Sequence, residues 1–165
     1  MPQKEGKPYY DFTVPAPGAG KNELFHRAQL FLVEYFKKST PEIKIADKED
    51  GVLAAGITLF YSYIDNPNVT KGKTQCLLYV KAENGSCHVS VYDFTIYRQE
   101  TEAGATRTAA NGATLLGGHT IWNRENETAL YQKAAGNDKR SLGLLEHVHD
   151  CVQKLQEALT KKLAG

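Results

Sequence analysis

The segment KTQCLLYVKAENGSCHVSVYDFTIYR, residues 73–98, has the pattern of a β-hairpin and decides the fold. Apolar and polar side chains alternate on both sides of Asn84-Gly85, a pair that favours a two-residue type I′ turn because both residues must take positive φ. This turn places Val80 opposite Val89, so that one face of the hairpin is almost entirely apolar.

The other face of the hairpin is polar and aromatic, and we predict that it contacts a partner. Its candidate binding residues are Tyr79, Lys81, His88 and Tyr92. Aromatic rings with polar tips are favoured on recognition surfaces. The alternative interpretation is that these neighbours across the strands only stabilise the sheet.

Further strands and two amphipathic helices flank the hairpin. In chain order, the expected elements are a strand at 9–14, a helix between the turn PGAGKNE (17–23) and Pro41, strands at 43–46 and 52–63, a short helix at 127–135 and a long helix at about 141–163. The long helix has an apolar stripe from Leu145 to Leu163. A shift in the hairpin's alternation near Asp93 predicts a β-bulge. This order predicts a two-layer α+β domain, with an antiparallel sheet and both long helices on one face.

The length of 165 residues is typical of one domain. We expect a flexible N-terminal tail at residues 1–8 and a single domain over residues 9–165. The long connections are a loop at residues 64–72 and a Gly/Ala/Thr-rich loop at about residues 101–120.

Charge and composition exclude several classes of protein. The 20 basic and 19 acidic residues leave a net charge of +1, whereas nucleic-acid-binding domains carry a basic face, so we expect no nucleic-acid partner. The apolar stretches are too short to span a bilayer. The chain shows no apolar signal-peptide core, so the protein is either cytoplasmic or the processed form of an exported precursor. A lipid anchor is expected only if a precursor segment has been removed.

No motif indicates catalysis, a cofactor or a metal. The turn PGAGKNE (17–23) lacks the first glycine and the hydroxyl residue of a phosphate-binding loop, and is interpreted as a strand-to-helix turn. Asp47, Glu49 and Asp50 lack the glutamate that ends an EF-hand calcium loop. We interpret these three carboxylates as part of a solvated turn.

The segment EHVHDC, residues 146–151, is the other candidate for a metal or enzymatic site. On a helix, His147 and Cys151 share one face whereas His149 points elsewhere, and no further Cys or His nearby in the sequence completes a tetrahedral site. We therefore interpret Cys151 as a buried thiol beside the apolar stripe.

The remaining cysteines and the single tryptophan have structural interpretations. Cys76 and Cys87 belong to the apolar face of the hairpin and lie far apart along the strands, so we expect inert thiols and no disulfide. His119 and Trp122, in GGHTIW, either line a pocket or belong to a loop that a buried indole anchors, and we favour the anchored loop.

Two short motifs carry a resemblance to a known family. The helix start GKNELFHRAQLFLVEYF (20–36) and the turn ADKEDGVLAAG (46–56), with the long strands after it, resemble a bacterial family of unknown function with a TATA-box-binding-protein-like fold. Its members are common among exported and lipid-anchored proteins of Bacteroidetes-type bacteria. The resemblance covers about residues 9–98. It implies a curved antiparallel sheet with helices on its convex side and a location in the cell envelope, and it implies no activity.

Three functions are compatible with the sequence. We favour a non-enzymatic envelope protein whose open sheet face binds a protein or a glycan. The first alternative is a carrier of a small apolar ligand with a helix-grip fold, in which the last helix stands off the apolar face of the hairpin around a cavity. The second alternative is an enzyme that uses His119 or the segment 146–151.

Overall fold

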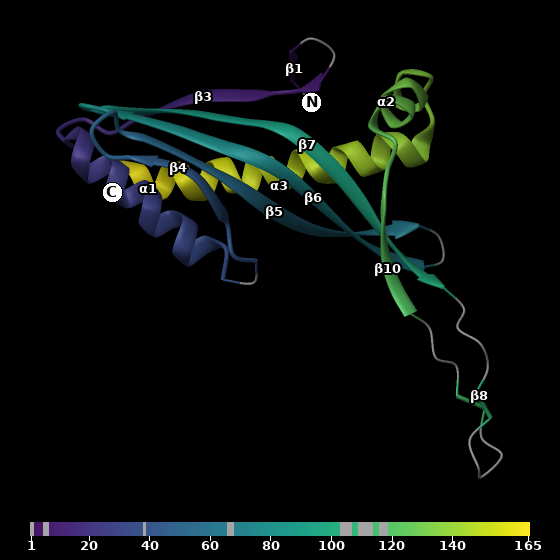
Figure 1. The fold of residues 1–165 in the computed structure, drawn as a ribbon. Helices are drawn as coiled ribbons and strands as arrows, with labels where there is room; N and C mark the ends of the chain where they lie inside the picture. The colour runs from purple at the N-terminus through teal and green to yellow at the C-terminus, as the bar shows by residue number, and fades with distance from the viewer. Residues whose placement is uncertain are drawn as a thin grey trace.

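Six antiparallel strands form the central sheet of the computed structural model, in the order β10-β7-β6-β5-β4, with β3 beside the first half of β7 (Figure 1). The structure describes residues 2–4, 7–37, 39–65, 68–102, 107–108, 114–115 and 119–165. The sheet strands are β3 (Tyr10–Pro15), β4 (Glu42–Asp47), β5 (Val52–Asp65), β6 (Asn68–Glu83), β7 (Ser86–Glu102) and β10 (His119–Arg124). Two short ladders pair β1 (Gln3–Lys4) with β2 (Lys7–Pro8), and β8 (Arg107–Thr108) with β9 (Thr114–Leu115). The helices are α1 (Lys21–Tyr35), α2 (Glu127–Ala135) and α3 (Lys139–Ala164).

The β6–β7 hairpin forms in the expected register, but its turn differs from the prediction. Only Gly85 of the Asn84-Gly85 pair has a positive φ, +83°, so the expectation of a type I′ turn is wrong. The segment before α1 and its first residue contact this turn. Asn84 Oδ1 accepts a hydrogen bond from the Lys21 backbone N–H (3.0 Å), and the Gly85 N–H donates to the Ala19 carbonyl (2.9 Å). These tertiary contacts override the local preference of an isolated hairpin.

The expected β-bulge is confirmed at Asp93. The ladder between β6 and β7 shifts register at this point, and Asp93 has a φ of +57°. The extra residue changes the alternation of β7, so that Phe94 and Ile96 are buried on the helix side of the sheet.

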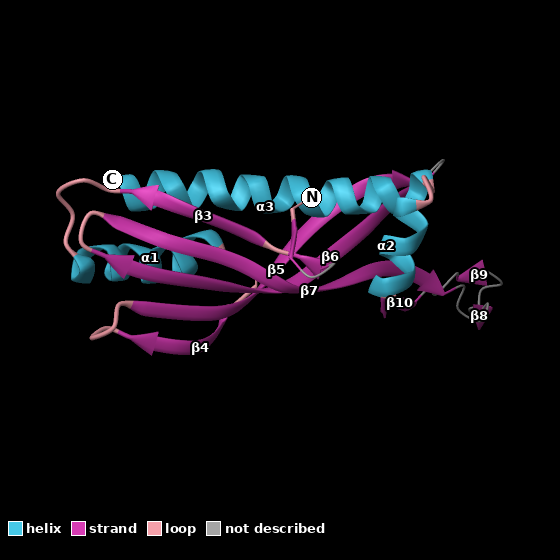
Figure 2. Cartoon of the chain, turned by 90° about the horizontal axis from the view of Figure 1, so that it is seen from above, coloured by secondary structure: helices cyan, strands magenta, loops and turns pink. Residues whose placement is uncertain are grey.

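One hydrophobic core lies between the sheet and the two long helices. Figure 2 shows α3 running along the sheet with α1 beside its C-terminal part, where Arg27 Nη1 donates to the Leu163 carbonyl (2.7 Å). The buried apolar residues of α3 are Leu144, Val148, Val152, Leu155, Leu159 and Leu163, and those of the hairpin include Leu78, Val80, Ala82, Cys87, Val89 and Val91. All of them belong to one cluster, which confirms the two-layer α+β arrangement.

The stripe of α3 packs directly on the sheet, which argues against the carrier alternative. A helix-grip carrier requires space between these two surfaces, whereas the residues from both are buried against one another. The stripe begins at Leu144 and not at Leu145, which is only partly buried.

The predicted loop at residues 64–72 is wrong for most of its length. β5 extends to Asp65 and β6 begins at Asn68, so the hairpin strands cover the segment. Gly72 lies inside β6 opposite Tyr61, whose ring occupies the space that a side chain at position 72 would need. This glycine therefore allows close packing and does not form a turn.

The predicted loop at residues 101–120 is wrong at both ends. β7 continues to Glu102 and pairs with β10, which begins at His119. Between them the structure describes only the β8–β9 ladder, and the rest of the loop lies outside the described residues. In the predicted tail, residues 1–8, the β1–β2 ladder is present and the Tyr9 N–H donates to the Pro2 carbonyl (3.1 Å).

Candidate functional site

The open face of the sheet, opposite α1 and α3, carries the four predicted binding residues. We refer to Tyr79, Lys81, His88 and Tyr92 as the near patch. The ladder pairs Tyr79 with Ser90 and Lys81 with His88, and Tyr92 follows on β7. His88 is exposed, and the other three are half-buried. The structure therefore brings the four predicted side chains together on two neighbouring strands.

Residues at the start of the chain add a hydrogen-bonded network to the near patch. The Tyr9 hydroxyl donates to Ser90 Oγ (3.3 Å), and Ser90 Oγ donates to Asp11 Oδ1 (2.8 Å). The same carboxylate oxygen lies 2.9 Å from His88 Nε2. The Tyr9 ring stacks on Tyr92, with centroids 5.9 Å apart. Sequence reasoning missed Tyr9 and Asp11 because it did not predict that β3 pairs with β7.

Lys81 also forms a hydrogen bond with the acidic turn between β4 and β5. Its Nζ donates to the Asp50 carbonyl (2.6 Å), and Lys21 Nζ donates to the Glu49 carbonyl. Within the turn, Asp47 Oδ1 accepts the Asp50 N–H (2.9 Å). The turn residues are exposed, so the interpretation as a solvated turn is confirmed. Two ammonium groups bound to its carbonyls disfavour a cation at the same oxygens.

A second cluster on the open face was not predicted. This far patch consists of Phe60, Lys73, Tyr97 and Trp122, from β5, β6, β7 and β10 respectively. Lys73 Nζ lies 5.0 Å from the ring centroid of Tyr97 and 4.7 Å from that of Trp122. Phe60 is 53% exposed and meets Trp122 edge to face at 6.5 Å. The pairing of β10 with β7 builds this cluster.

The prediction of a loop anchored by a buried indole is wrong. Trp122 lies in β10 opposite Gln99 and is half-buried. His119 is the first residue of β10, and its side chain lies outside the described residues. A signal for the strand was present, because Thr120, Ile121 and Trp122 are all residue types enriched in strands.

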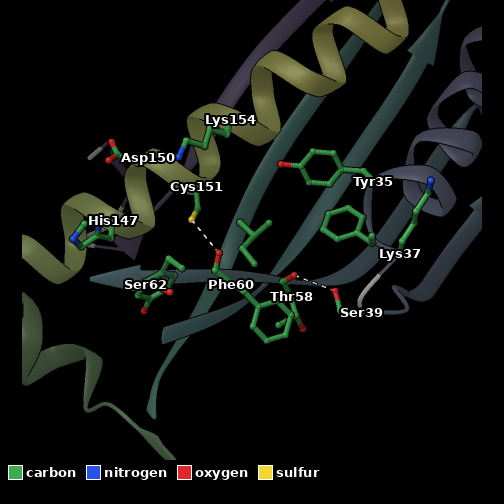
Figure 3. A pocket seen from close by; sticks show the side chains of 13 residues that line it. Tyr35, Lys37, Ser39, Thr58, Phe60, Ser62, His147, Asp150, Cys151 and Lys154 are labelled. Atoms are coloured by element: carbon green, nitrogen blue, oxygen red, sulfur yellow. Dashed lines mark hydrogen bonds between the residues drawn. The ribbon is translucent and has the colours of Figure 1, made fainter. Parts of the chain in front are cut away.

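A cleft of about 600 Å³ lies between α3, the end of α1 and β5 (Figure 3). Its lining includes Tyr35, His147, Asp150, Cys151 and Lys154. The EHVHDC segment therefore contributes three side chains to one cleft.

Two hydrogen bonds reach the strand at the base of this cleft. Ser39 Oγ donates to the Thr58 carbonyl (3.3 Å), and Cys151 Sγ donates to the Phe60 carbonyl (3.8 Å). Cys151 is half-buried, so the interpretation as a buried thiol is only partly right. This burial still raises the pKa of the Cys151 thiol above its ordinary value. Cys151 is therefore a protonated thiol at neutral pH and a weak nucleophile.

The two histidines of the segment point in different directions, as predicted. The His147 ring stacks on Tyr61, with centroids 6.5 Å apart. His149 Nδ1 lies 2.9 Å from the hydroxyl of Tyr10, a buried residue of β3. Burial raises the pKa of the Tyr10 phenol, so Tyr10 stays protonated and its contact with His149 ties β3 to α3. Within the described residues, no three His, Cys, Asp or Glu side chains converge to hold a metal ion.

Cys76 and Cys87 are buried free thiols, as predicted. Burial raises the pKa of Cys87 to about 11, and burial also raises the pKa of Cys76. Among the described helices, none is long and apolar enough to cross a membrane.

A family model described as a domain of unknown function (DUF4468) with TBP-like fold matches residues 10–97. The chain belongs to this family. A crystal structure of a DUF4468 family protein from Bacteroides ovatus ATCC 8483 is similar over 99% of this chain and 90% of that chain, with a TM-score of 0.70 and 11% identity. A TBP-like protein from Parabacteroides distasonis ATCC 8503 is similar over 58% of this chain and 60% of that chain, with a TM-score of 0.47 and 15% identity. No curated protein matches the chain. The predicted family and its fold are confirmed.

The region that matches DUF4468 includes the whole near patch but only part of the far patch. The matched region, residues 10–97, contains α1 and all four residues of the near patch. Trp122 of the far patch lies beyond it, on β10. The near patch is thus built within the DUF4468 match, whereas the far patch also needs the strand that follows it.

Proposed function

We propose that this DUF4468 protein is a non-enzymatic binding module whose open sheet face contacts a protein or a glycan. The observation that carries this proposal is the network around the near patch. Hydrogen bonds link Tyr9, Ser90 and Asp11, and His88 Nε2 lies 2.9 Å from the Asp11 carboxylate. The Tyr92 ring stacks on the Tyr9 ring. Side chains that are held in place before binding lose less rotational entropy when a partner docks, so more of the contact energy appears as affinity.

The chemistry of the cleft supports a binding function over an enzymatic one. Cys151 donates its hydrogen bond to a backbone carbonyl, which cannot act as a base, and burial raises the pKa of its thiol. A nucleophilic cysteine needs a neighbouring base or a lowered pKa. We expect Cys151→Ser and His147→Ala to leave binding by the near patch unchanged.

A location in the cell envelope is also part of the proposal. Its support is the resemblance to exported and lipid-anchored proteins of Bacteroidetes-type bacteria. Fractionation of cells that express the full gene tests it: immunodetection in the membrane or periplasmic fraction is expected. Detection in the cytoplasmic fraction alone would contradict the location without affecting the binding proposal.

Capture experiments with matched tyrosine variants test the binding function. The immobilised protein is incubated with an envelope extract of the producing organism and, separately, with a glycan array. Tyr79→Ser/Tyr92→Ser should reduce specific retention at least tenfold while the melting temperature changes by only a few degrees. Tyr35→Ser, which removes a 40% exposed tyrosine from the cleft, is the control and should leave retention unchanged. Equal retention by the wild type and the near-patch variant would disprove the proposal.

A further inference from the structure

A shallow pocket lies at the far patch, where β5, β6, β7 and β10 run side by side (Figure 1). Its volume is about 470 Å³, and its lining includes Phe60, Ser62, Lys71, Gln99 and Trp122. Small-molecule sites in proteins have volumes of roughly 300–1,000 Å³, so the pocket is large enough for a compact ligand.

Two aromatic rings form the apolar walls of the pocket. Phe60 is 53% exposed, and Trp122 meets it edge to face, with centroids 6.5 Å apart. The face of an aromatic ring carries partial negative charge and attracts groups with partial positive charge. The C–H groups on one face of a pyranose ring are such groups, and they form a flat apolar surface of matching shape.

Polar side chains surround these rings. Ser62 provides an exposed hydroxyl, and Gln99 provides an amide that can both donate and accept hydrogen bonds. Lys71 lines the pocket, and the ammonium of Lys73 lies over the rings of Tyr97 and Trp122. The described lining residues include no aspartate or glutamate, so the ammonium of Lys71 has no opposite charge within the pocket.

We infer that this pocket binds an acidic saccharide, specifically a chain of hexuronate units. One pyranose packs against Phe60 and Trp122, its hydroxyls bond to Gln99 and Ser62, and its carboxylate pairs with Lys71. A carboxylate is favoured over a neutral sugar because charge-assisted hydrogen bonds are about twice as strong as neutral ones. The inference goes beyond the proposed function, because it adds to the near patch a second binding site on the same open face.

A nucleic acid fits the open face less well than a hexuronate. Stacking on aromatic rings and contact with lysine also occur in single-strand binding, but a strand needs positive charge along its whole path. In the near patch that path would meet the Asp11 carboxylate, which lies 2.9 Å from His88 and accepts a hydrogen bond from Ser90. Oligothymidylate is therefore the competing probe in the test.

Titration calorimetry with defined oligosaccharides tests the inference. The probes are hexamers of galacturonate, mannuronate and guluronate, and the methyl ester of each, which keeps the pyranose but removes the charge. At least one acid hexamer should bind, and Trp122→Ala should raise its Kd at least tenfold. Lys71→Gln should weaken binding of the acid hexamer to the level of its methyl ester. The same substitution should leave binding of the methyl ester unchanged.

Controls separate the failure of this inference from the failure of the proposed function. Tyr79→Ser/Tyr92→Ser should change the Kd of the acid hexamer less than about twofold, which is roughly 0.4 kcal/mol. No binding by any acid hexamer, equal binding of acid and ester, or tighter binding of oligothymidylate would overturn the inference. In each of those cases, loss of retention by the near-patch variant in the capture experiment would still support a binding module.

Discussion

Replacing Leu155 with alanine tests the direct packing of α3 on the sheet. The Leu155 side chain is 1% exposed and belongs to the cluster that contains both hairpin strands. Truncation of a fully buried leucine costs the transfer energy of the removed atoms and the energy of the cavity left behind, together about 2.7–5.0 kcal/mol. We expect the free energy of unfolding to fall by about 3–4 kcal/mol, a large part of the roughly 5–15 kcal/mol that stabilises a typical domain.

Leu145→Ala is the matched control, on the same helix but only partly buried. It should cost about 1 kcal/mol, because less apolar surface is lost and no enclosed cavity forms. Urea unfolding followed by far-ultraviolet circular dichroism measures both variants, and an unchanged slope with denaturant would show that the transitions are comparable. If α3 instead enclosed an apolar cavity, Leu155 would already border empty space. Equal losses for the two variants would therefore refute direct packing.

Three further predictions concern glycines, a helix cap and the cysteines. Gly85→Ala should lower the free energy of unfolding by about 1–2 kcal/mol because Gly85 has a φ of +83°; the space around it is open, so the cost comes from the backbone alone. Gly143→Ala, inside α3 and also in open space, should raise the free energy of unfolding by about 0.5–1 kcal/mol. Thermal unfolding measures both variants. Asp138 is the N-cap of α3, and hydrogen bonds from Ser141 lower the pKa of its carboxyl group in the folded protein. The contribution of Asp138 to the free energy of unfolding should therefore be complete above its pKa in the unfolded chain and be lost as the pH falls through its pKa in the folded protein. Asp138→Asn, whose side chain cannot be protonated in this range, should make thermal stability less dependent on pH below about 4. With an aromatic disulfide reagent at about pH 8, the half-buried Cys151 should react slowly in the native protein, while Cys76 and Cys87 should react only after unfolding; a fast reaction of either would contradict their burial.

The hairpin could be predicted from the sequence because its signal is local. The alternation around Val80 and Val89 and the shift near Asp93 specify its faces and its bulge, and both are present in the structure. The two helices were found because their apolar stripes repeat every three or four residues. Their packing on one face follows from the single apolar face of the sheet.

The parts of the site that sequence reasoning missed depend on pairing between distant strands. Asp11 reaches His88 only because β3 pairs with β7, and Trp122 reaches Lys73 only because β10 pairs with the other end of the same strand. Pairings over such long sequence separations leave no local pattern. The turn at Asn84-Gly85 was misjudged for the same reason, since the start of α1, far away in the sequence, contacts it.

The edge strand β4 bears on the proposal that a partner docks on the open face. β4 is the edge strand next to β5, and all of its residues are exposed, which would normally invite another strand to pair with it. The register of β4 is irregular between Ile43 and Ile45, and Lys44 within this irregularity pairs with Glu42 at 2.5 Å. Irregular registers and lysines are devices by which natural proteins block strand addition. These features of β4 disfavour strand addition at this edge, which is consistent with the proposed docking of a partner on the open face.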